Sequence, residues 1–392
     1  MEDLSIYHDS NLLHNQEDML KYRPGGYHPV RLGGVFKDGR YKIHHKLGWG
    51  GFSTVWLARD NESDKWVAVK IKTANSPKQS RELHNLQSLT GIAQGNLSSK
   101  GIVRLLDHFF HQGPNGTHQC LVFELLGPTV DAVVGDIHQS GDVLDPETIL
   151  RMSKQLLQAI TFMHEVGYTH ADLSGRNVAF TSNMLSRLTE EGLFEVLGPP
   201  ETEELCRRDG GPLNQGVPCQ LVKATGWDNW TDEDDEDIRI FDLGEAFLNG
   251  AVSENLPQPS HLRAPETIFM DSCDSRHDLW RAGIMIYTFL FGSVPFQYWY
   301  DDVLVAQMIH FVEELPMEWQ QKWDDMRLKS GRDYSLPDEK PPRSKLEQKF
   351  DDRIHDQRLK PLFPVIHGLM RFIPSNRISA SEALDMISSL TS

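Results

Sequence analysis

The strongest constraint on this chain is the segment at residues 170–177, taken together with residues 241–244. The first segment has the sequence His-Ala-Asp-Leu-Ser-Gly-Arg-Asn, and the second has the sequence Phe-Asp-Leu-Gly. They place a carboxylate at Asp172, an amide five residues later at Asn177, and a second carboxylate at Asp242. Carboxylate and amide oxygens suit Mg²⁺, and a separate carboxylate can accept the proton of a hydroxyl. We therefore predict that Asp172 is a catalytic base and that Asn177 and Asp242 bind Mg²⁺.

A glycine-rich segment at residues 47–55 lies between two predicted strands, and its glycines let the backbone approach a phosphate closely. An isolated Gly-x-Gly is a weak signal. Here Lys70 follows in Val-Ala-Val-Lys on the next predicted strand, which strengthens the prediction. We expect Lys70 to bind the α- and β-phosphates of ATP and to pair with Glu82 on the following helix. The alternative for Lys70 is a lysine on the surface of a strand, and the alternative for Glu82 is a solvated carboxylate on a helix.

The order of predicted elements is strands first and helices second, which indicates an α+β chain with two lobes. Short apolar runs bounded by turn residues predict strands, and apolar residues at helical spacing predict helices. The predicted strands are 41–43, 54–58, 66–71, 102–106 and 119–124, and the first predicted helices are 81–89 and 146–166. The expected domains are an irregular arm (1–40), an N-lobe (41–126) and a C-lobe (127–392), with 181–237 as a mostly exposed insertion in the C-lobe.

Taken together, these motifs resemble the eukaryotic protein kinase family, from about residue 41 to about residue 385. Residues 26–30, 46–57 and 115–124 are similar to the SR-protein kinases of the CMGC group. The resemblance implies a small antiparallel sheet with one helix in the N-lobe and a mainly helical C-lobe. It also implies serine/threonine kinase activity with ATP and Mg²⁺. The implied substrates are basic or Arg/Ser-rich proteins linked to mRNA splicing.

The resemblance further assigns individual site residues. The implied catalytic residues are Asp172, Lys70, Glu82 and Arg176. The implied ATP contacts are Leu47, Gly48, Gly50, Phe52, Val55, Ala68, Lys70, Phe123, Glu124 and Leu126. The implied metal ligands are Asn177 and Asp242, whereas His170 is expected to pack and to bond the backbone.

Two positions depart from the family pattern. Ala171 stands where an arginine is common, and Ser174 stands where a lysine is common. Loss of that lysine removes a charge near the γ-phosphate, which could lower the rate by roughly 10²–10³-fold, although Arg176 could compensate. A pseudokinase that binds ATP without transferring phosphate is therefore the competing hypothesis. Tyrosine specificity is a third hypothesis that rests only on the Ser-Gly-Arg-Asn part of the loop.

Composition limits the partners of the chain. Its 392 residues have a formal net charge of −17, which argues against direct binding to nucleic acid or an anionic membrane and is compatible with a basic substrate. Solubility alone is the other interpretation. Four cysteines without Cys-x-x-Cys spacing indicate a reducing compartment, and the first residues do not resemble a signal peptide. We therefore expect the protein in the cytoplasm and the nucleus. We also expect it to be a monomer. Candidate arginine-accepting carboxylates are Asp301, Asp302, Glu313 and Glu314, which could equally form a solvated face.

Overall fold

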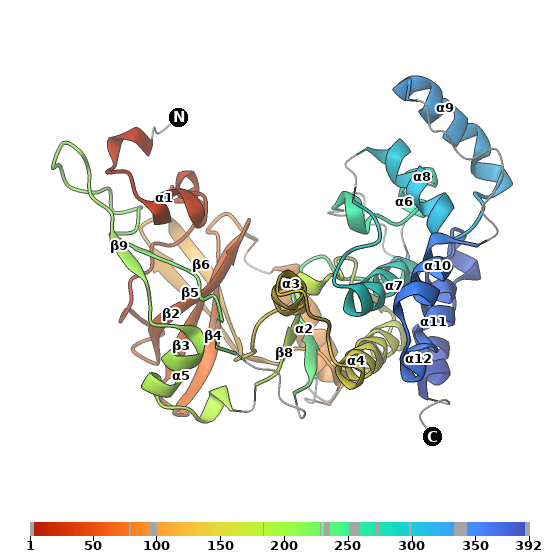
Figure 1. The fold of residues 1–392 in the computed structure, drawn as a ribbon. Helices are drawn as coiled ribbons and strands as arrows, with labels where there is room; N and C mark the ends of the chain where they lie inside the picture. Colours follow the sequence, from red (N-terminus) through yellow and green to blue (C-terminus); the bar gives the residue numbers. More distant parts are fainter. Residues whose placement is uncertain are drawn as a thin grey trace. The chain divides into compact units, whose positions relative to one another are not determined.

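The computed structural model describes residues 4–77, 80–94, 100–182, 184–227, 229–230, 236–250, 259–270, 274–297, 300–332 and 343–388 (Figure 1). The chain forms two compact units. Unit 1 comprises Met1–Thr90, Val103–Pro128 and Phe180–Glu236, and unit 2 comprises Gly91–Ile102, Thr129–Ala179 and Asp237–Ser392. Unit 1 contains the large sheet and unit 2 contains most of the helices, so the predicted α+β class is confirmed.

The sheet of unit 1 is antiparallel, with the strand order β1-β2-β3-β4-β6-β5. Its strands are β1 (Val35–Phe36), β2 (Tyr41–Gly50), β3 (Ser53–Asp60), β4 (Lys65–Lys72), β5 (Leu105–Gly113) and β6 (Gly116–Glu124). Side chains alternate between the two faces of a strand. On one face, an apolar cluster includes Trp56, Val69 and Val122. The other face carries Val55, Ala68, Lys70 and Phe123, which the strand register places beside one another.

A two-residue turn at Pro114 and Asn115 joins β5 and β6. Gly113 pairs with Gly116, and Gly116 has a φ of 130°, which favours glycine. Asn115 does not have a positive φ, and its side chain makes contacts outside the turn. Its buried amide donates to the carbonyl oxygens of Tyr27 at 2.7 Å and Gly216 at 2.6 Å. This side chain therefore ties the hairpin to two segments distant in sequence.

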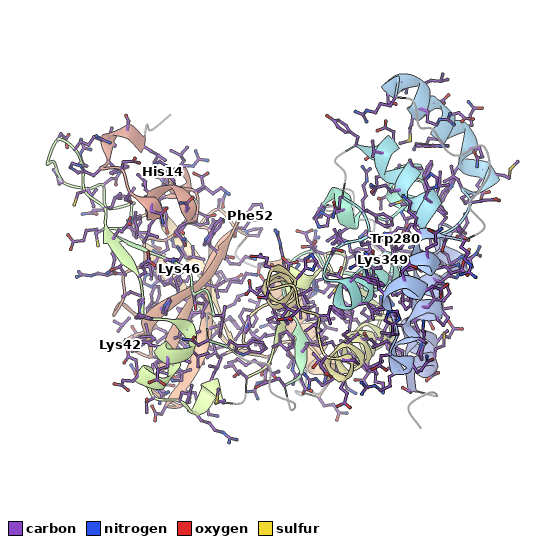
Figure 2. All side chains as sticks on the ribbon, viewed as in Figure 1. His14, Lys42, Lys46, Phe52, Trp280 and Lys349 are labelled. Atoms are coloured by element: carbon purple, nitrogen blue, oxygen red, sulfur yellow. The ribbon has the colours of Figure 1, made fainter. Side chains whose placement is uncertain are left out.

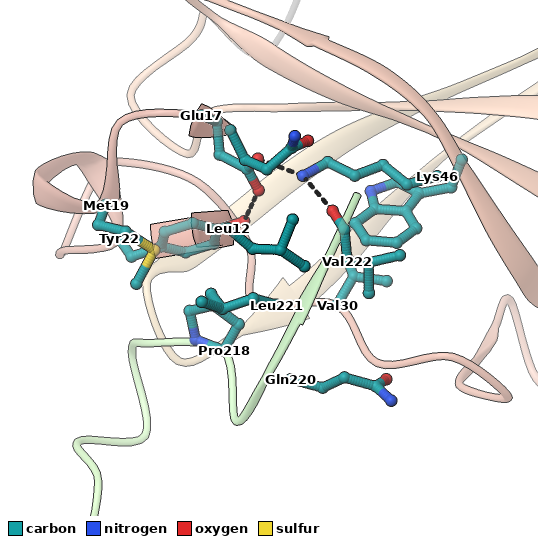
Figure 3. Close-up of a pocket in the computed structure, with 12 residues that line it drawn as sticks. Leu12, Glu17, Met19, Tyr22, Val30, Lys46, Pro218, Gln220, Leu221 and Val222 are labelled. Atoms are coloured by element: carbon teal, nitrogen blue, oxygen red, sulfur yellow. Dashed lines mark hydrogen bonds and ion pairs between the residues drawn. The ribbon is translucent and has the colours of Figure 1, made fainter. Parts of the chain in front are cut away.

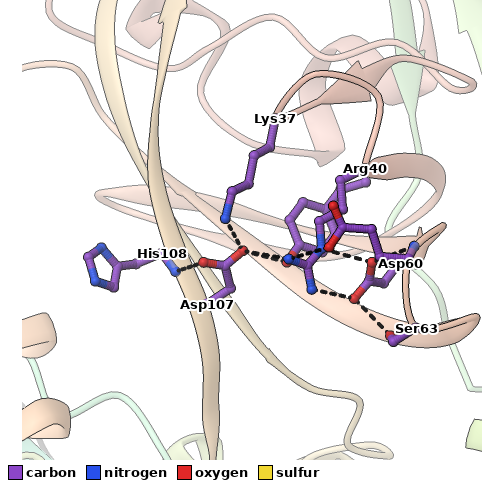
Figure 4. Close-up of polar contacts among 8 residues, drawn as sticks. Lys37, Arg40, Asp60, Ser63, Asp107 and His108 are labelled. Atoms are coloured by element: carbon purple, nitrogen blue, oxygen red, sulfur yellow. Dashed lines mark hydrogen bonds and ion pairs between the residues drawn. The ribbon is translucent and has the colours of Figure 1, made fainter.

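An ion-pair network joins the β1–β2 turn to the neighbouring strands (Figure 4). Lys37 donates to Asp107 at 2.5 Å, and the Tyr41 hydroxyl donates to the same carboxylate at 2.6 Å. Arg40 makes two bonds to Asp60, at 2.9 and 2.8 Å, and lowers the pKa of that carboxyl. Bidentate pairing of this kind fixes both side chains more firmly than a single contact does.

The arm and the insertion differ from the sequence-based expectation, because both pack in unit 1. Apolar residues of the arm (Leu12, Tyr22 and Tyr27) form one cluster with Leu205 and Leu221 of the insertion. These residues are separated by polar stretches, so neither segment has a periodic pattern. The elements are η1 (Leu4–Ile6), α1 (Asn11–Asn15), η2 (Met19–Lys21), η5 (Leu185–Arg187), α5 (Glu190–Leu197), β9 (Thr202–Glu204) and β10 (Gln220–Val222).

The helix that follows β4 is α2 (Arg81–Ile92), which carries Glu82 in its first turn. In unit 2, α4 (Pro146–Glu165) begins where the sequence predicts, because Asp145 caps it and Pro146 occupies its first turn. The other helices that the structure describes there are α3 (Val130–Gln139), η4 (Gly175–Asn177), η6 (Ser260–Leu262), α6 (Glu266–Phe269), α7 (Arg276–Phe291), α8 (Asp301–Phe311), η7 (Met317–Trp319), α9 (Gln320–Ser330), α10 (Lys345–Arg353), η8 (Gln357–Leu359), α11 (Leu362–Leu369), η9 (Pro374–Asn376) and α12 (Ala380–Ser388).

Two short strand pairs flank the catalytic-loop segment at residues 170–177. They are β7 (Tyr168–Thr169) with β12 (Phe247–Leu248), and β8 (Val178–Phe180) with β11 (Ile238–Ile240). Asn177 therefore comes directly before one strand of a pair, and Asp242 follows the other strand. Among the described residues, no helix is both long enough and apolar enough to cross a membrane.

Candidate active site

Helix α7 anchors the first residues of the catalytic-loop segment. The Asp278 carboxylate accepts from the backbone N–H of His170 at 2.7 Å and of Ala171 at 2.9 Å. Burial acts to raise the pKa of Asp278, but hydrogen bonds from His164 and from this backbone outweigh it and lower the pKa to about 2. Ala171 has a φ of 69°, a conformation that non-glycine residues rarely adopt. Two bonds to one ionised carboxylate stabilise this turn.

His170 is a positioning residue, as the sequence predicts. Its Nδ1 accepts from the backbone N–H of Asp172 at 3.2 Å, and its Nε2 lies 3.1 Å from the carbonyl oxygen of Phe241. A carbonyl oxygen can only accept, so Nε2 is the donor of this bond. Both ring nitrogens are therefore engaged with the backbone, and the ring joins the segment that carries Asp172 to the segment that carries Asp242.

The Asp172 carboxylate is held on both of its oxygens. The Asn177 amide donates to Oδ2 at 2.9 Å and to the Asp172 carbonyl oxygen at 2.7 Å. Arg281 Nη1 donates to Oδ1 at 3.0 Å. The Asp172 side chain is 29% exposed, so a substrate hydroxyl can still reach it. A carboxylate has about four lone-pair sites, and these two bonds leave sites for a further donor.

The same bonds fix which Asn177 atom can bind a cation. Because Asn177 Nδ2 donates to Asp172, its Oδ1 remains an acceptor. Asp242 supplies a carboxylate, and its φ of 60° is a strained backbone conformation of the kind found at functional sites. Gly244 has no side chain, and a Cβ there would lie 3.3 Å from Asp242 Oδ1. Asn177 and Asp242 thus offer the hard oxygen donors that suit a divalent cation.

The second group of predicted residues belongs to unit 1. Lys70 Nζ lies 2.7 Å from Glu82 Oε1, so the structure contains the predicted pair between β4 and α2. Lys72, two residues further along the same strand face, lies 3.1 Å from Glu82 Oε2. Glu82 is only 1% exposed, and burying a carboxylate is unfavourable unless it is paired and hydrogen-bonded. The Glu82 carboxylate therefore holds Lys70 in place at the sheet face.

Four of the predicted nucleotide contacts of unit 1, Val55, Ala68, Lys70 and Phe123, share one face of the sheet. Val55 pairs with Lys70, and Ala68 pairs with Phe123, so their side chains point the same way. Leu47, Gly48, Val55, Ala68 and Leu126 are half-buried, whereas Phe123 is buried. Gly50 ends β2, and Phe52 at the following turn is 76% exposed (Figure 2). Glu124 instead accepts from the backbone N–H of Arg104 at 2.8 Å.

Arg176 was predicted to be catalytic, but the bond that the structure gives for its side chain is to Asp131 and not to the Asp172 carboxylate. Its Nε lies 3.3 Å from Asp131 Oδ2 on α3, and both side chains are exposed. Sequence reasoning missed Arg281, which contacts Asp172 instead. The local sequence gave no specific signal for it, because the first turns of α7 also carry Arg276, His277 and Asp278.

The candidate arginine-accepting carboxylates are mostly engaged within the chain. A carboxylate that is already paired offers less to an incoming arginine than a free one does. The pairs are Asp301 with Arg263 at 2.5 Å, Asp302 with Arg332 at 2.9 Å, and Glu313 with Arg371 at 2.5 Å.

Comparisons with known proteins identify the family and the fold of this chain. The protein kinase domain model matches residues 41–208. The serine/threonine-protein kinase SRPK of Physarum polycephalum is 30% identical over 342 residues, which cover 79% of this chain and 75% of that protein. The serine/threonine-protein kinase SKY1 of Saccharomyces cerevisiae is 39% identical over 171 residues. That match covers 42% of this chain, and it spans only 23% of the length of the yeast protein.

A serine/threonine protein kinase of Aspergillus fumigatus matches almost the whole chain. It is 27% identical over 398 residues, which cover 96% of this chain and 91% of that protein. A crystal structure of a kinase domain aligns with a TM-score of 0.63 at 18% identity, and covers 92% of this chain and 98% of that one. At that identity the likeness shows the fold, and it confirms the predicted two-lobed architecture.

Proposed function

Because this chain belongs to the protein kinase family, among the SR-protein kinases, we propose that it transfers the γ-phosphate of Mg-ATP to serine or threonine hydroxyls of basic, Arg/Ser-rich proteins. The observation that carries the proposal is the Asp172 carboxylate, which is held by Asn177 and Arg281 and remains partly exposed. A general base must be oriented and accessible at the same time.

In the proposed reaction, the oxygen of the substrate hydroxyl bonds to the γ-phosphorus, and Asp172 accepts the proton of that hydroxyl. The bond from that phosphorus to the bridging oxygen breaks, and ADP carries away the electron pair. Lys70, held by Glu82, would bind the phosphates in the positions that remain with ADP. The amide of Asn177 and the carboxylate of Asp242 would hold Mg²⁺, which when bound neutralises charge on the phosphates.

The proposed substrate class rests on the relatives and on charge. The Physarum relative carries the name SRPK, and this chain has a net charge of −17, which suits a basic partner. The engagement of Asp301, Asp302 and Glu313 in internal pairs weighs against them as the arginine-accepting surface. Substrate arginines would have to exchange with these partners or bind elsewhere.

A pseudokinase is the second candidate function, and Ser174 is the observation that favours it. Ser174 stands where the family places a lysine that faces the γ-phosphate. Its side chain makes no capping bond at the start of η4. Such a protein would bind ATP through Lys70 and act through protein contacts without transferring phosphate.

Transfer of labelled γ-phosphate from Mg-ATP to an Arg-Ser repeat peptide tests the proposal, with Asp172→Ala as the control. We expect label on serine with the native chain and none with the variant. If neither the repeat peptide nor a general basic protein receives label, although ATP binding is demonstrated, the pseudokinase is the correct function. Label on tyrosine alone would contradict the serine/threonine assignment.

A further inference from the structure

Arg281 is a fully buried arginine at the catalytic loop. Its side chain is 0% exposed, and it lies in the second turn of α7, three residues after Asp278. Nη1 donates to Asp172 Oδ1 at 3.0 Å and to the Leu173 carbonyl oxygen at 3.2 Å. One nitrogen thus contacts two consecutive residues of the loop.

Burying a guanidinium is unfavourable unless a carboxylate and further acceptors compensate it. The acceptors here are the proposed base and the backbone beside it, so the guanidinium and the loop hold each other in place. The loop carries two fewer cations than the family pattern, because Ala171 and Ser174 occupy positions where the family commonly has an arginine and a lysine. The positive charge beside Asp172 comes from α7.

We propose that Arg281 is the positioning residue for Asp172 and that it acts from helix α7. The Arg281 bond holds Oδ1, the Asn177 bond holds Oδ2, and together they fix the rotation of the carboxylate. A fixed carboxylate presents its remaining lone pairs to the substrate hydroxyl in one direction. This inference rests on the proposed kinase activity, because it concerns the base of that reaction.

A purely structural arginine would have a different effect. It would stabilise the chain whether or not Asp172 is ionised, and its loss would lower the folded fraction without a specific effect on turnover. Arg377 provides this comparison inside the same unit. It is also 0% exposed, and it pairs with Glu266 at 2.5 Å. Arg377→Gln therefore removes an equally buried guanidinium from a different carboxylate.

The experiment measures kcat and KM for ATP and peptide, per folded molecule, in the native chain and in Arg281→Gln, Arg281→Lys and Arg377→Gln. It repeats the Arg281→Gln substitution in an Asp172→Asn background. We expect Arg281→Gln to lower kcat by about 10²-fold with little change in KM for ATP, since a misplacement of about 1 Å has that effect on rate. Arg281→Lys should recover part of the rate, because a lysine retains the charge without the planar fork.

The Asp172→Asn background is compared by urea unfolding. There Arg281→Gln should lower the free energy of unfolding less than it does in the native chain, because the two residues act through one bond. Arg377→Gln should lower the melting temperature with a much smaller effect on kcat. The proposal is wrong if Arg281→Gln retains native kcat, or if it lowers the free energy of unfolding equally in both backgrounds. Should Arg281→Gln fail to fold, Arg281→Lys is scored by the same two criteria.

A native chain that transfers no phosphate would overturn the proposed function and not by itself the pairing. In that case, the coupling between Arg281→Gln and Asp172→Asn is measured in urea unfolding. Effects that simply add would overturn the pairing as well, whereas a coupling energy would support the bond and leave the reaction to be reassigned.

Discussion

Substitution of Glu17 by glutamine should strongly destabilise unit 1, because it leaves a buried lysine without its carboxylate. Glu17 is 6% exposed and Lys46 is 1% exposed, and the two form an ion pair (Figure 3). Lys46 also donates to the Val222 carbonyl oxygen at 3.0 Å, and the Tyr22 hydroxyl donates to Glu17 at 2.6 Å. The pair therefore joins the arm, the glycine-rich strand β2 and the insertion.

The magnitude follows from burial. Removing one partner of a buried ion pair costs about 3–5 kcal/mol, because the other charge remains without compensation. Tyr22→Phe removes a neutral donor from the same carboxylate and should cost only about 0.5–1.5 kcal/mol. Replacing both charges, with Glu17→Leu and Lys46→Met together, should recover much of the loss, because apolar side chains avoid the cost of desolvation.

The loss of stability caused by Glu17→Gln should also depend on pH. Burial lowers the pKa of Lys46, and Glu17 opposes this effect, so Glu17→Gln should lower that pKa further. Between the folded-state pKa and the unfolded value of about 10.5, the unfolded chain binds more protons, and stability rises with pH. The difference in stability between variant and native chain should therefore be smaller at about pH 9.5 than at pH 7.

Urea denaturation followed by circular dichroism at both pH values measures these differences. The reasoning is refuted if Glu17→Gln destabilises no more than Tyr22→Phe does, or if its effect is the same at both pH values. An unchanged stability of the double variant relative to Glu17→Gln would also contradict it.

Three further predictions concern other parts of unit 1. Lys70→Met should lower kcat by about 10²-fold or more, whereas Lys72→Met, which removes the other cation on Glu82, should lower it far less in the same transfer assay. Asn115→Ala should lower the free energy of unfolding by about 2–4 kcal/mol, because two buried carbonyl groups lose their donor, and urea denaturation checks this. Burial and two neighbouring histidines lower the pKa of His28 to about 3, so the unfolded chain binds more protons between about pH 6.5 and pH 3 and stability falls as pH falls through that range. His28→Phe should therefore reduce the difference between urea midpoints at pH 7 and pH 5.

The sequence predicted those parts of the site whose geometry is local. Asp172, Asn177 and His170 lie within eight residues, and their mutual bonds follow from the turn of one short segment. Lys70 and Glu82 come from adjacent elements, so the strand-helix pattern was enough to pair them. These relations need little of the rest of the fold.

Long-range relations could not be predicted in this way. Arg281 lies 109 residues after Asp172, and nothing in its local pattern distinguishes a buried partner of the loop from a solvated helix residue. The insertion was expected to be exposed because glycine, proline and glutamate interrupt its apolar residues. Single residues such as Leu205 and Leu221 nevertheless reach the arm, and only the folded chain brings them together.

The arm and the glycine-rich turn are connected by the same kind of long-range contact. The Tyr27 hydroxyl donates to the Gly50 carbonyl oxygen at 2.7 Å, and Lys21 Nζ donates to that of Gly51 at 3.0 Å. Glycine permits a mobile turn, and two donors from outside the turn restrict that freedom. Because the buried pair at Glu17 anchors the arm a few residues earlier, the position of the glycine-rich turn depends on a segment that precedes residues 41–208, which match the protein kinase domain model.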